Sequence, residues 1–262
     1  MPTSLSVNIN KIALLRNSRE GNYPNLLCFA EDAIQAGAQG ITVHPRPDQR
    51  HIRPNDVAEL KQLTDRYEGC EFNVEGNPFE QRVVGNTGTE YPGFMQIIEN
   101  MRPDQATLVP DSNDQLTSDH GFDLREDTRA LEGIIKQLKR WNVRVSLFMD
   151  PDIAQIDRAK EIGADRIEFY TGPYAANYNT EAHQETINTY RKAAQHAHNI
   201  GLTINAGHDL NQRNLPEFLS IAPIAEVSIG HALTVEALKA GYINTVSAYS
   251  KICQFDYTEA SC

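Results

Sequence analysis

Histidines and arginines follow an apolar run near residue 40. The run, Gly-Ile-Thr-Val at residues 40–43, suits a buried strand and leads directly into His44, Arg46, Arg50 and His51. Imidazole groups exchange protons near neutral pH, and guanidinium groups pair with phosphate or carboxylate groups. Two prolines stiffen this loop because they fix φ and remove backbone donors. The stretch therefore indicates a site that binds a small anionic substrate and moves protons.

Other apolar runs also lead into polar side chains. These are Asn8, Asn10, Lys11, Arg19, Glu75, Thr117, Glu168, His208 and His231, with Thr117 reached through a longer loop. Because a buried, unpaired carboxylate is costly, Glu75 is either part of a structural ion pair or a general acid/base with a pKa raised by burial. His44 alone would fit a core histidine. We favour a catalytic role because His44 shares its expected location with two other histidines and two glutamates.

Eight short apolar runs have the length and composition of parallel strands covered on both faces. They span residues 5–9, 40–44, 71–75, 105–110, 144–149, 166–170, 202–206 and 226–229. Amphipathic stretches between them predict helices at 25–36, 54–67, 124–141, 152–162 and 180–200. This alternation within 262 residues predicts one α/β domain, a TIM-type (β/α)8 barrel. An open doubly wound sheet is the alternative, although the first strand–helix junction lacks a G-x-G-x-x-G fingerprint.

A barrel would bring these polar side chains together, because the active site of such a barrel lies at the C-terminal ends of its strands. Glycine turns at residues 205–208 and 229–231 follow the last two predicted strands. Loops in these positions often bind phosphate through backbone N–H groups and a helix N-terminus. We therefore expect Gly230 and His231 to help bind a phosphate group.

Two segments depart from the strand–helix rhythm. Residues 79–94 are rich in glycine and polar residues, which predicts an irregular insertion before a short helix at 95–101. The tail after Cys253 is expected to be loose or to lie on a neighbouring subunit.

Composition excludes several classes of protein. A net charge of −11 argues against general binding of nucleic acid, and no apolar run is long enough to span a membrane. Neither a secretion signal nor a CxxC pair is visible, so we expect a cytoplasmic protein with reduced thiols. HExxH is absent, and the HxH pair formed by His196 and His198 falls in the predicted helix 180–200 and not after a strand, which argues against a catalytic metal.

The chain resembles the pyridoxine 5′-phosphate synthase family, the ring-closing enzymes of vitamin B6 synthesis. The resemblance extends from residue 7 to about residue 245 and is carried by segments 7–13 (VNINKIA), 15–19 (LRNSR), 40–44 (GITVH), 50–52 (RHI), 73–75 (NVE), 108–110 (LVP), 145–148 (VSLF), 205–208 (NAGH) and 229–232 (IGHA), with Arg46, Glu168 and Thr171-Gly172 between them. It implies a TIM barrel that works as a homo-oligomer, an octamer in known members, without an organic cofactor. The implied reaction joins 1-deoxy-D-xylulose 5-phosphate to 3-amino-2-oxopropyl phosphate, and the products are pyridoxine 5′-phosphate, phosphate and water.

The resemblance also implies a role for each matching residue. His44 and Glu75 would be proton acceptors, His208 a proton donor, and Glu168 would stabilise charge in the transition state. The aminoketone phosphate would be held by Asn8, Arg19, Gly230 and His231, and the deoxyxylulose phosphate by Arg46, His51 and Thr117.

The chain departs from the family pattern at three places. Asn10 and Lys11 stand where many members have Asp-His, and Asp209 stands where glycine is common after the histidine. We keep all three as candidate substrate-binding residues, with Lys11 able to pair with a phosphate as a point charge. The insertion at 79–94 is also longer than expected. Two alternatives to the synthase are a Schiff-base aldolase that uses Lys11 and a non-catalytic barrel that binds a phosphorylated metabolite.

Overall fold

A closed parallel barrel forms the centre of the molecule. The computed structural model describes residues 2–84, 90–112, 115–255 and 257. Among these residues, eight parallel strands close in the order β1-β10-β9-β8-β7-β6-β3-β2. Their bounds are β1 Ser4–Asn8, β2 Gly40–Val43, β3 Glu71–Gly76, β6 Gln105–Leu108, β7 Arg144–Met149, β8 Arg166–Tyr170, β9 Thr203–Gly207 and β10 Glu226–Ile229. The predicted TIM-type barrel is thereby confirmed, and each strand lies within two residues of its predicted bounds.

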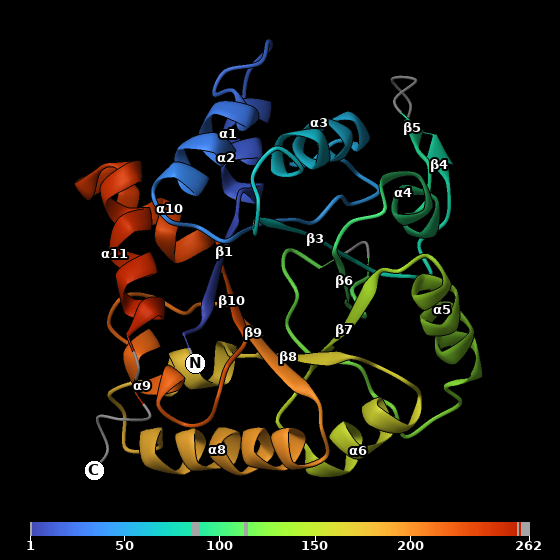
Figure 1. The fold of residues 1–262 in the computed structure, drawn as a ribbon, viewed down its shortest axis with the longest axis vertical. Coiled ribbons are helices and arrows are strands. Elements are labelled where there is room, and N and C mark those ends of the chain that lie inside the picture. The colour runs from blue at the N-terminus through green and yellow to red at the C-terminus, as the bar shows by residue number, and fades with distance from the viewer. Residues whose placement is uncertain (1, 85–89, 113–114, 256, 258–262) are drawn as a thin grey trace.

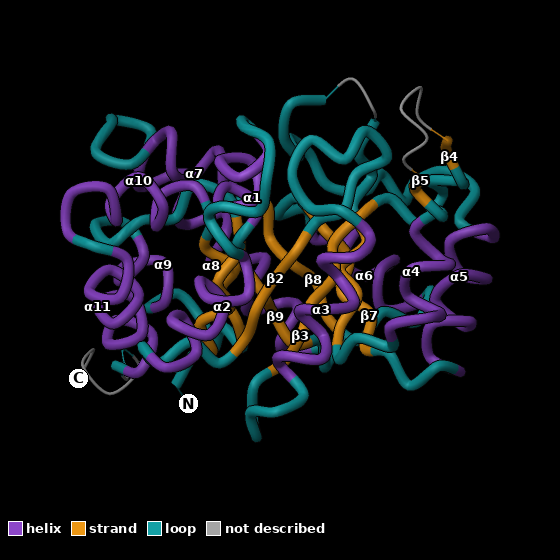
Figure 2. The backbone as a smooth tube through the Cα atoms, turned by 90° about the horizontal axis from the view of Figure 1, so that it is seen from above, coloured by secondary structure: helices purple, strands orange, loops and turns teal. Residues whose placement is uncertain are grey.

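Helices surround this barrel, as Figures 1 and 2 show. Their bounds are α1 Asn10–Asn17, α2 Leu26–Gln35, α3 Pro54–Thr64, α4 Phe94–Met101, α5 Arg129–Arg140, α6 Ile153–Glu161, α7 Gly172–Asn177, α8 His183–Asn199, α9 Leu215–Leu219, α10 His231–Ala240 and α11 Tyr242–Gln254. Helix α2 begins where the Asn25 side chain accepts hydrogen bonds from the N–H groups of Leu27 and Cys28. None of the helices in the described residues is long and apolar enough to cross a membrane.

Three helices are shorter at one end than the sequence predicts. Helix α5 begins at residue 129 rather than 124, because the preceding residues form turns in which the Asp123 and Asp127 side chains accept from the N–H groups of Arg125 and Arg129. Helix α8 begins at residue 183 because the Thr180 hydroxyl bonds back to the Asn177 carbonyl in a turn. Helix α3 ends at Thr64, after which Arg66 and Tyr67 donate to carbonyls three residues back.

A hydrogen bond joins the C-terminal helix to the N-terminal part of the chain. The Cys253 carbonyl, near the end of α11, accepts a 2.9 Å hydrogen bond from the Thr3 N–H just before β1. Beyond this helix, the Phe255 and Tyr257 rings lie 4.8 Å apart. Residues 256 and 258–262 lie outside the described part of the chain, so the character of the tail stays a prediction. Cys28, Cys70 and Cys253 are free thiols.

The segment at residues 79–94 contains a small hairpin. Strands β4 (Val83–Val84) and β5 (Glu90–Tyr91) pair in antiparallel fashion, and Tyr91 is buried. Two-residue strands are too short to show an alternating pattern, which explains why the sequence did not predict them. Residues 85–89, which join the strands, lie outside the described part.

The N-terminal end of the barrel interior is charged. Arg144, Arg166, Glu71, Glu226 and Gln105 each begin a strand, and their side chains form one connected network. The Arg166–Glu226 pair, for example, has Nη1 and Oε2 3.3 Å apart. Opposite charges thus compensate one another in a place where an isolated charge would be strongly destabilising.

Candidate active site

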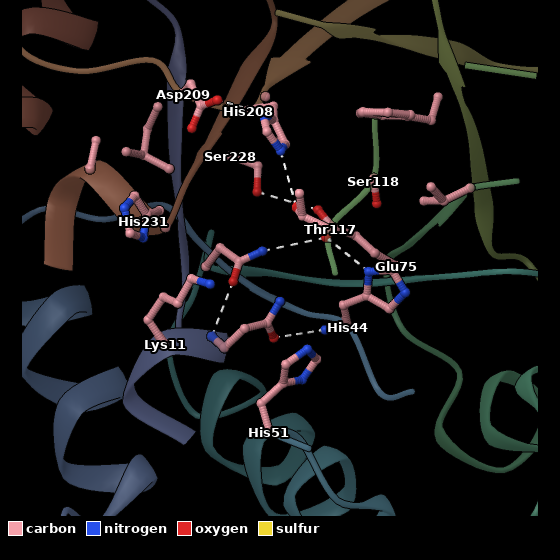
Figure 3. A pocket seen from close by; sticks show the side chains of 18 of the residues that line it. Lys11, His44, His51, Glu75, Thr117, Ser118, His208, Asp209, Ser228 and His231 are labelled. Atoms are coloured by element: carbon pink, nitrogen blue, oxygen red, sulfur yellow. Dashed lines mark hydrogen bonds and ion pairs between the residues drawn. The ribbon is translucent and has the colours of Figure 1, made fainter. Parts of the chain in front are cut away.

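The C-terminal ends of the strands surround a cavity of about 400 Å³. Of the residues predicted to form the site, those that line the cavity are Asn8, Asn10, Lys11, His44, Arg46, His51, Glu75, Thr117, Glu168, His208, Asp209, Gly230 and His231. Figure 3 shows His44, Glu75 and His208 around one hollow, although they come from three different strands. Barrel closure therefore unites residues that are far apart in the sequence.

Arg19 is the predicted site residue that the cavity does not include. It is exposed, just past the end of α1, and its N–H bonds to the Arg16 carbonyl at 3.4 Å. Its neighbour Arg16 points inward instead and binds Asp56 through two hydrogen bonds of 2.6 and 2.8 Å. Within the described chain, Arg19 contributes nothing to the cavity wall, and its role in substrate binding stays a prediction.

Glu75 lies at the centre of the cavity. It is almost fully buried, and two weak donors reach its carboxylate at 3.4 Å, the Asn8 amide and the Ser228 hydroxyl. Burial raises the pKa of Glu75 to about 8, and the negative charges of Asp111 and Glu226 act in the same direction. Glu75 can therefore hold or release a proton near neutral pH, which an ordinary glutamate cannot do.

His44 lies beside this carboxylate. Its Nδ1 is 3.9 Å from Glu75 Oε2, and its backbone N–H donates to the Asn10 side chain at 3.0 Å. Burial lowers the pKa of His44 well below the usual range, and the positive charge of Arg46 lowers it further. A neutral imidazole is thus available to accept a proton, and Asn10 fixes the backbone that presents it.

A second buried carboxyl group, Glu168, faces the cavity from β8. Burial raises the pKa of Glu168 well above the usual range, and the charge of Glu75 acts in the same direction, so the neutral form of this group is favoured. The Thr107 hydroxyl approaches its Oε2 at 3.4 Å. At Gly207 an added Cβ would lie only 2.6 Å from Glu168 Oε1, so glycine is needed at that position to leave room for the acid.

His208 follows in a turn with unusual backbone geometry. The φ angles of His208 and Asp209 are 88° and 58°, in the left-handed region that residues other than glycine rarely adopt. The Thr171 hydroxyl, at 2.6 and 2.5 Å from the carbonyls of Gly207 and His208, holds the turn. The strained turn directs the imidazole over the cavity, where Nε2 lies 3.1 Å from the Thr117 hydroxyl.

Asp209 faces the histidine before it. Its Oδ2 lies 2.9 Å from His208 Nδ1, and the pKa of Asp209 is lowered first by this contact and then by the charges of His208, His231 and Lys11. The carboxylate is half exposed at the cavity rim. In this arrangement Asp209 contacts His208 and can orient its imidazole ring.

One end of the cavity is rich in cationic and hydrogen-bonding groups. Arg46, His51 and Thr117 lie there, together with Arg50, which donates to the Gln115 carbonyl at 3.1 Å. Burial lowers the pKa of His51 to about 3, followed by the effect of Arg46. Because His51 Nδ1 accepts the Ile52 N–H at 2.9 Å, the neutral ring carries its proton on Nε2. His51 can therefore donate to an anion.

The other end is formed by Asn8, Gly230 and the first residue of α10, His231. A Cβ at Gly230 would lie 3.2 Å from the Asn8 carbonyl oxygen, so the close approach of the two strands depends on glycine. The N-terminus of α10 presents unpaired N–H groups at the cavity, which suits an anion. Lys11 lines the same cavity.

Several cavity residues were not predicted. Ser228, Phe148 and Ser118 line the cavity, and Asp111 lies directly behind it, bonded to Arg46. Asp111 comes three residues after the end of β6, so its position after a strand was a signal that could have been used. In the described residues no three His, Cys, Asp or Glu side chains are grouped so that they could hold a metal ion.

Comparison with known proteins finds relatives over nearly the whole chain. The family model described as pyridoxal phosphate biosynthesis protein PdxJ matches residues 5–255. The chain belongs to the PdxJ family. It is 52% identical over 261 residues to pyridoxine 5′-phosphate synthase of Xanthomonas axonopodis pv. citri, covering 99% of this chain and 100% of that protein. It is 49% identical to the synthase of Xylella fastidiosa, with coverage of 95% and 94%.

Solved structures with little sequence identity share the barrel. A subunit of the Amycolatopsis orientalis BexX/CysO complex superposes with a TM-score of 0.58 at 12% identity, covering 99% of this chain and 92% of that one. Phosphoribosylanthranilate isomerase from Thermotoga maritima gives 0.54 at 10% identity, with coverage of 96% and 98%. These likenesses concern the fold. The full-length relatives confirm the predicted enzyme class, a pyridoxine 5′-phosphate synthase, and set aside the aldolase and the non-catalytic barrel.

Proposed function

We propose that this cavity condenses 1-deoxy-D-xylulose 5-phosphate with 3-amino-2-oxopropyl phosphate to give pyridoxine 5′-phosphate, phosphate and water. The observation that carries the proposal is the convergence of His44, Glu75, Glu168 and His208 on one cavity, between two ends whose groups suit anions. Joining an amine to a ketone, eliminating water and phosphate, and aromatising the ring is a series of proton transfers. Acid/base groups held between two phosphate anchors suit such a series.

The four groups are assigned distinct roles. Neutral His44 and the ionised form of Glu75 accept protons from the substrates, and His208 donates one. Burial favours the protonated form of Glu168, which donates a hydrogen bond to an oxygen that becomes negative in the transition state. These roles need no organic cofactor, and the absence of one stays a prediction.

The two ends of the cavity suit the two phosphate groups. Arg46, His51 and Thr117 would hold the deoxyxylulose phosphate, with His51 donating from Nε2. Asn8, Gly230 and His231 would hold the aminoketone phosphate at the N-terminus of α10, assisted by Lys11 as a point charge. Arg19 joins this second group only if the chain around it moves or if another copy supplies it.

The homo-oligomer predicted from the family is supported by an apolar surface. Exposed large side chains gather on α1 and α10, which pack against each other: Leu14, Leu15, Val235 and Leu238. Monomeric proteins rarely expose such clusters, and a second copy of the chain is the occupant we propose. An octamer and a cytoplasmic location stay predictions from the family resemblance.

The substitution Glu75→Gln tests the catalytic assignment. It keeps the shape of the side chain and removes the ionisable group, so the rate of pyridoxine 5′-phosphate formation should fall by about 100-fold or more. Circular dichroism should show an unchanged fold. Glu161→Gln, on the exposed surface of α6, is the matched control and should retain full activity. Near-normal turnover by Glu75→Gln would remove Glu75 from the mechanism.

A further inference from the structure

A carboxylate that none of the proposed roles uses lies directly behind the cavity. Asp111 follows β6 in the chain, and only 3% of its surface is exposed. Its carbonyl accepts a 2.7 Å hydrogen bond from the Asn77 side chain, which fixes the backbone. A buried, fixed carboxylate is costly unless it interacts with a partner, so its contacts show what it does.

The first partner of Asp111 is Arg46. Arg46 Nη2 donates to Asp111 Oδ2 in a buried ion pair, and the Ser118 hydroxyl donates to the same oxygen at 2.9 Å. Ser118 is next to Thr117, which is proposed to hold the same phosphate group. A guanidinium group has five N–H donors, so Arg46 keeps donors for an anion while Asp111 holds one edge.

The second partner is His44. Asp111 Oδ2 lies 3.8 Å from His44 Nε2, and Glu75 Oε2 lies 3.9 Å from Nδ1 on the other side of the ring. The proposed proton acceptor therefore lies between two carboxyl groups. Arg46, Arg50 and His51 oppose a positive charge on His44. Asp111, 3.8 Å from the ring and bonded to Arg46, is placed to offset that opposition from the side opposite Glu75.

We propose that Asp111 is a positioning residue and counter-charge for the reaction, which limits how tightly Arg46 holds phosphate and stabilises His44 once it has accepted a proton. The inference rests on the proposed function of the cavity. Phosphate is itself a product, so an Arg46 without its counter-charge would bind the anion more tightly and release it more slowly. Asp111 therefore favours turnover in two ways, because it eases the release of phosphate and stabilises protonated His44. It also weakens the binding of phosphate groups in the ground state.

The isosteric variant Asp111→Asn separates these two effects. We expect its dissociation constant for inorganic phosphate, measured by calorimetry, to fall several-fold, and Arg46→Gln identifies the part of the binding that depends on Arg46. The KM for the deoxyxylulose phosphate should fall in the same direction, while kcat falls about tenfold. A role limited to holding the loop together would instead weaken binding. Asp123→Asn, on an exposed residue paired with Arg125, is the matched control.

Asp111→Glu keeps the charge and should leave phosphate affinity within about twofold of that of the unchanged protein. Weaker phosphate binding by Asp111→Asn, or an unchanged kcat, would overturn the inference. Because phosphate binding is measured without turnover, the inference stands or falls even if the unchanged protein forms no pyridoxine 5′-phosphate. Failure of the unchanged protein to form pyridoxine 5′-phosphate would refute the proposed function instead.

Discussion

Glu75 keeps its proton at a pH at which an isolated glutamate has lost it. Its pKa is raised from 4.5 to about 8 because the carboxyl group is buried beside other acids. Glu168 is shifted in the same direction by burial and by Glu75, so the two groups titrate as a pair. Their protonation therefore depends on the environment that the barrel builds, and no feature of the local sequence encodes it.

This shift predicts the pH dependence of catalysis. A proton acceptor must be ionised, so kcat/KM should rise with pH through an apparent pKa near 8. The second ionisation of a phosphate ester, near pH 6, lies well below this limb, so the two can be separated. A pH–rate profile of the free enzyme provides the measurement. An acid limb near pH 4.5 would show that Glu75 is not shifted.

Thermal stability provides an independent test of the raised pKa of Glu75. The folded protein holds the Glu75 proton up to about pH 8, whereas the unfolded chain releases it near pH 4.5. The stability that this group contributes is therefore full below about pH 4.5 and is lost as the pH rises through about 8. Glu75→Gln should thus have a higher Tm than the unchanged protein at pH 8, with a smaller difference at pH 5.

Single residues were predictable where a distinctive side chain lies near or just after the C-terminal end of a strand. His44, Glu75, Glu168 and His208 were found in this way, and all four line the cavity. Asp111 was missed because its partner Arg46 is far from it in sequence. The ion pair exists only once β2 and β6 are both in the barrel.

At the scale of elements, the turn after β9 positions His208 at a cost in backbone strain. His208 and Asp209 both have positive φ, and the Thr171 hydroxyl, at the adjacent end of β8, holds the carbonyls of Gly207 and His208. The sequence indicated a glycine-containing turn but not this conformation, because left-handed geometry at histidine and aspartate is imposed by tertiary contacts.

The substitution Thr171→Val tests the importance of this turn. It keeps the shape of the side chain and removes the hydroxyl, so the turn should relax and His208 should move from its place. Since a displacement of about 1 Å can slow an enzyme as much as 100-fold, we expect kcat to fall at least tenfold with little change in KM. Thr189→Val on the exposed face of α8, which removes a comparable hydroxyl, should behave like the unchanged protein. Equal kcat values for both variants would contradict this role.

Strands and helices differed in how well their sequence patterns predicted them. Barrel strands, with continuous apolar runs, were located almost to the residue. Helices α1, α10 and α11 were not predicted, because their apolar residues do not form one stripe: some pack on the barrel and others remain exposed. Of these helices, α1 and α10 form the surface proposed for association, so sequence reasoning could not place that surface either.

At the scale of the whole molecule, the exposed leucines of α1 and α10 predict association. Leu238 is 80% exposed, the largest fraction among the four apolar side chains of the proposed contact. Leu238→Asp should shift the protein to smaller species in sedimentation velocity, because a charge in an apolar interface is unfavourable. Ile153→Asp introduces the same charge at an exposed apolar residue on α6, away from this surface, and should leave the assembly unchanged. Identical sedimentation of both variants would exclude α10 as an interface.

Leu14 belongs to two surfaces at once. It is 43% exposed beside Leu15, and it also lines the cavity in which the substrates are proposed to react. If copies of the chain meet at this face, part of the reaction chamber is enclosed only in the assembled state. Turnover per polypeptide would then depend on how concentrated the enzyme is, since dilution that separates the copies also opens a wall of the chamber to water.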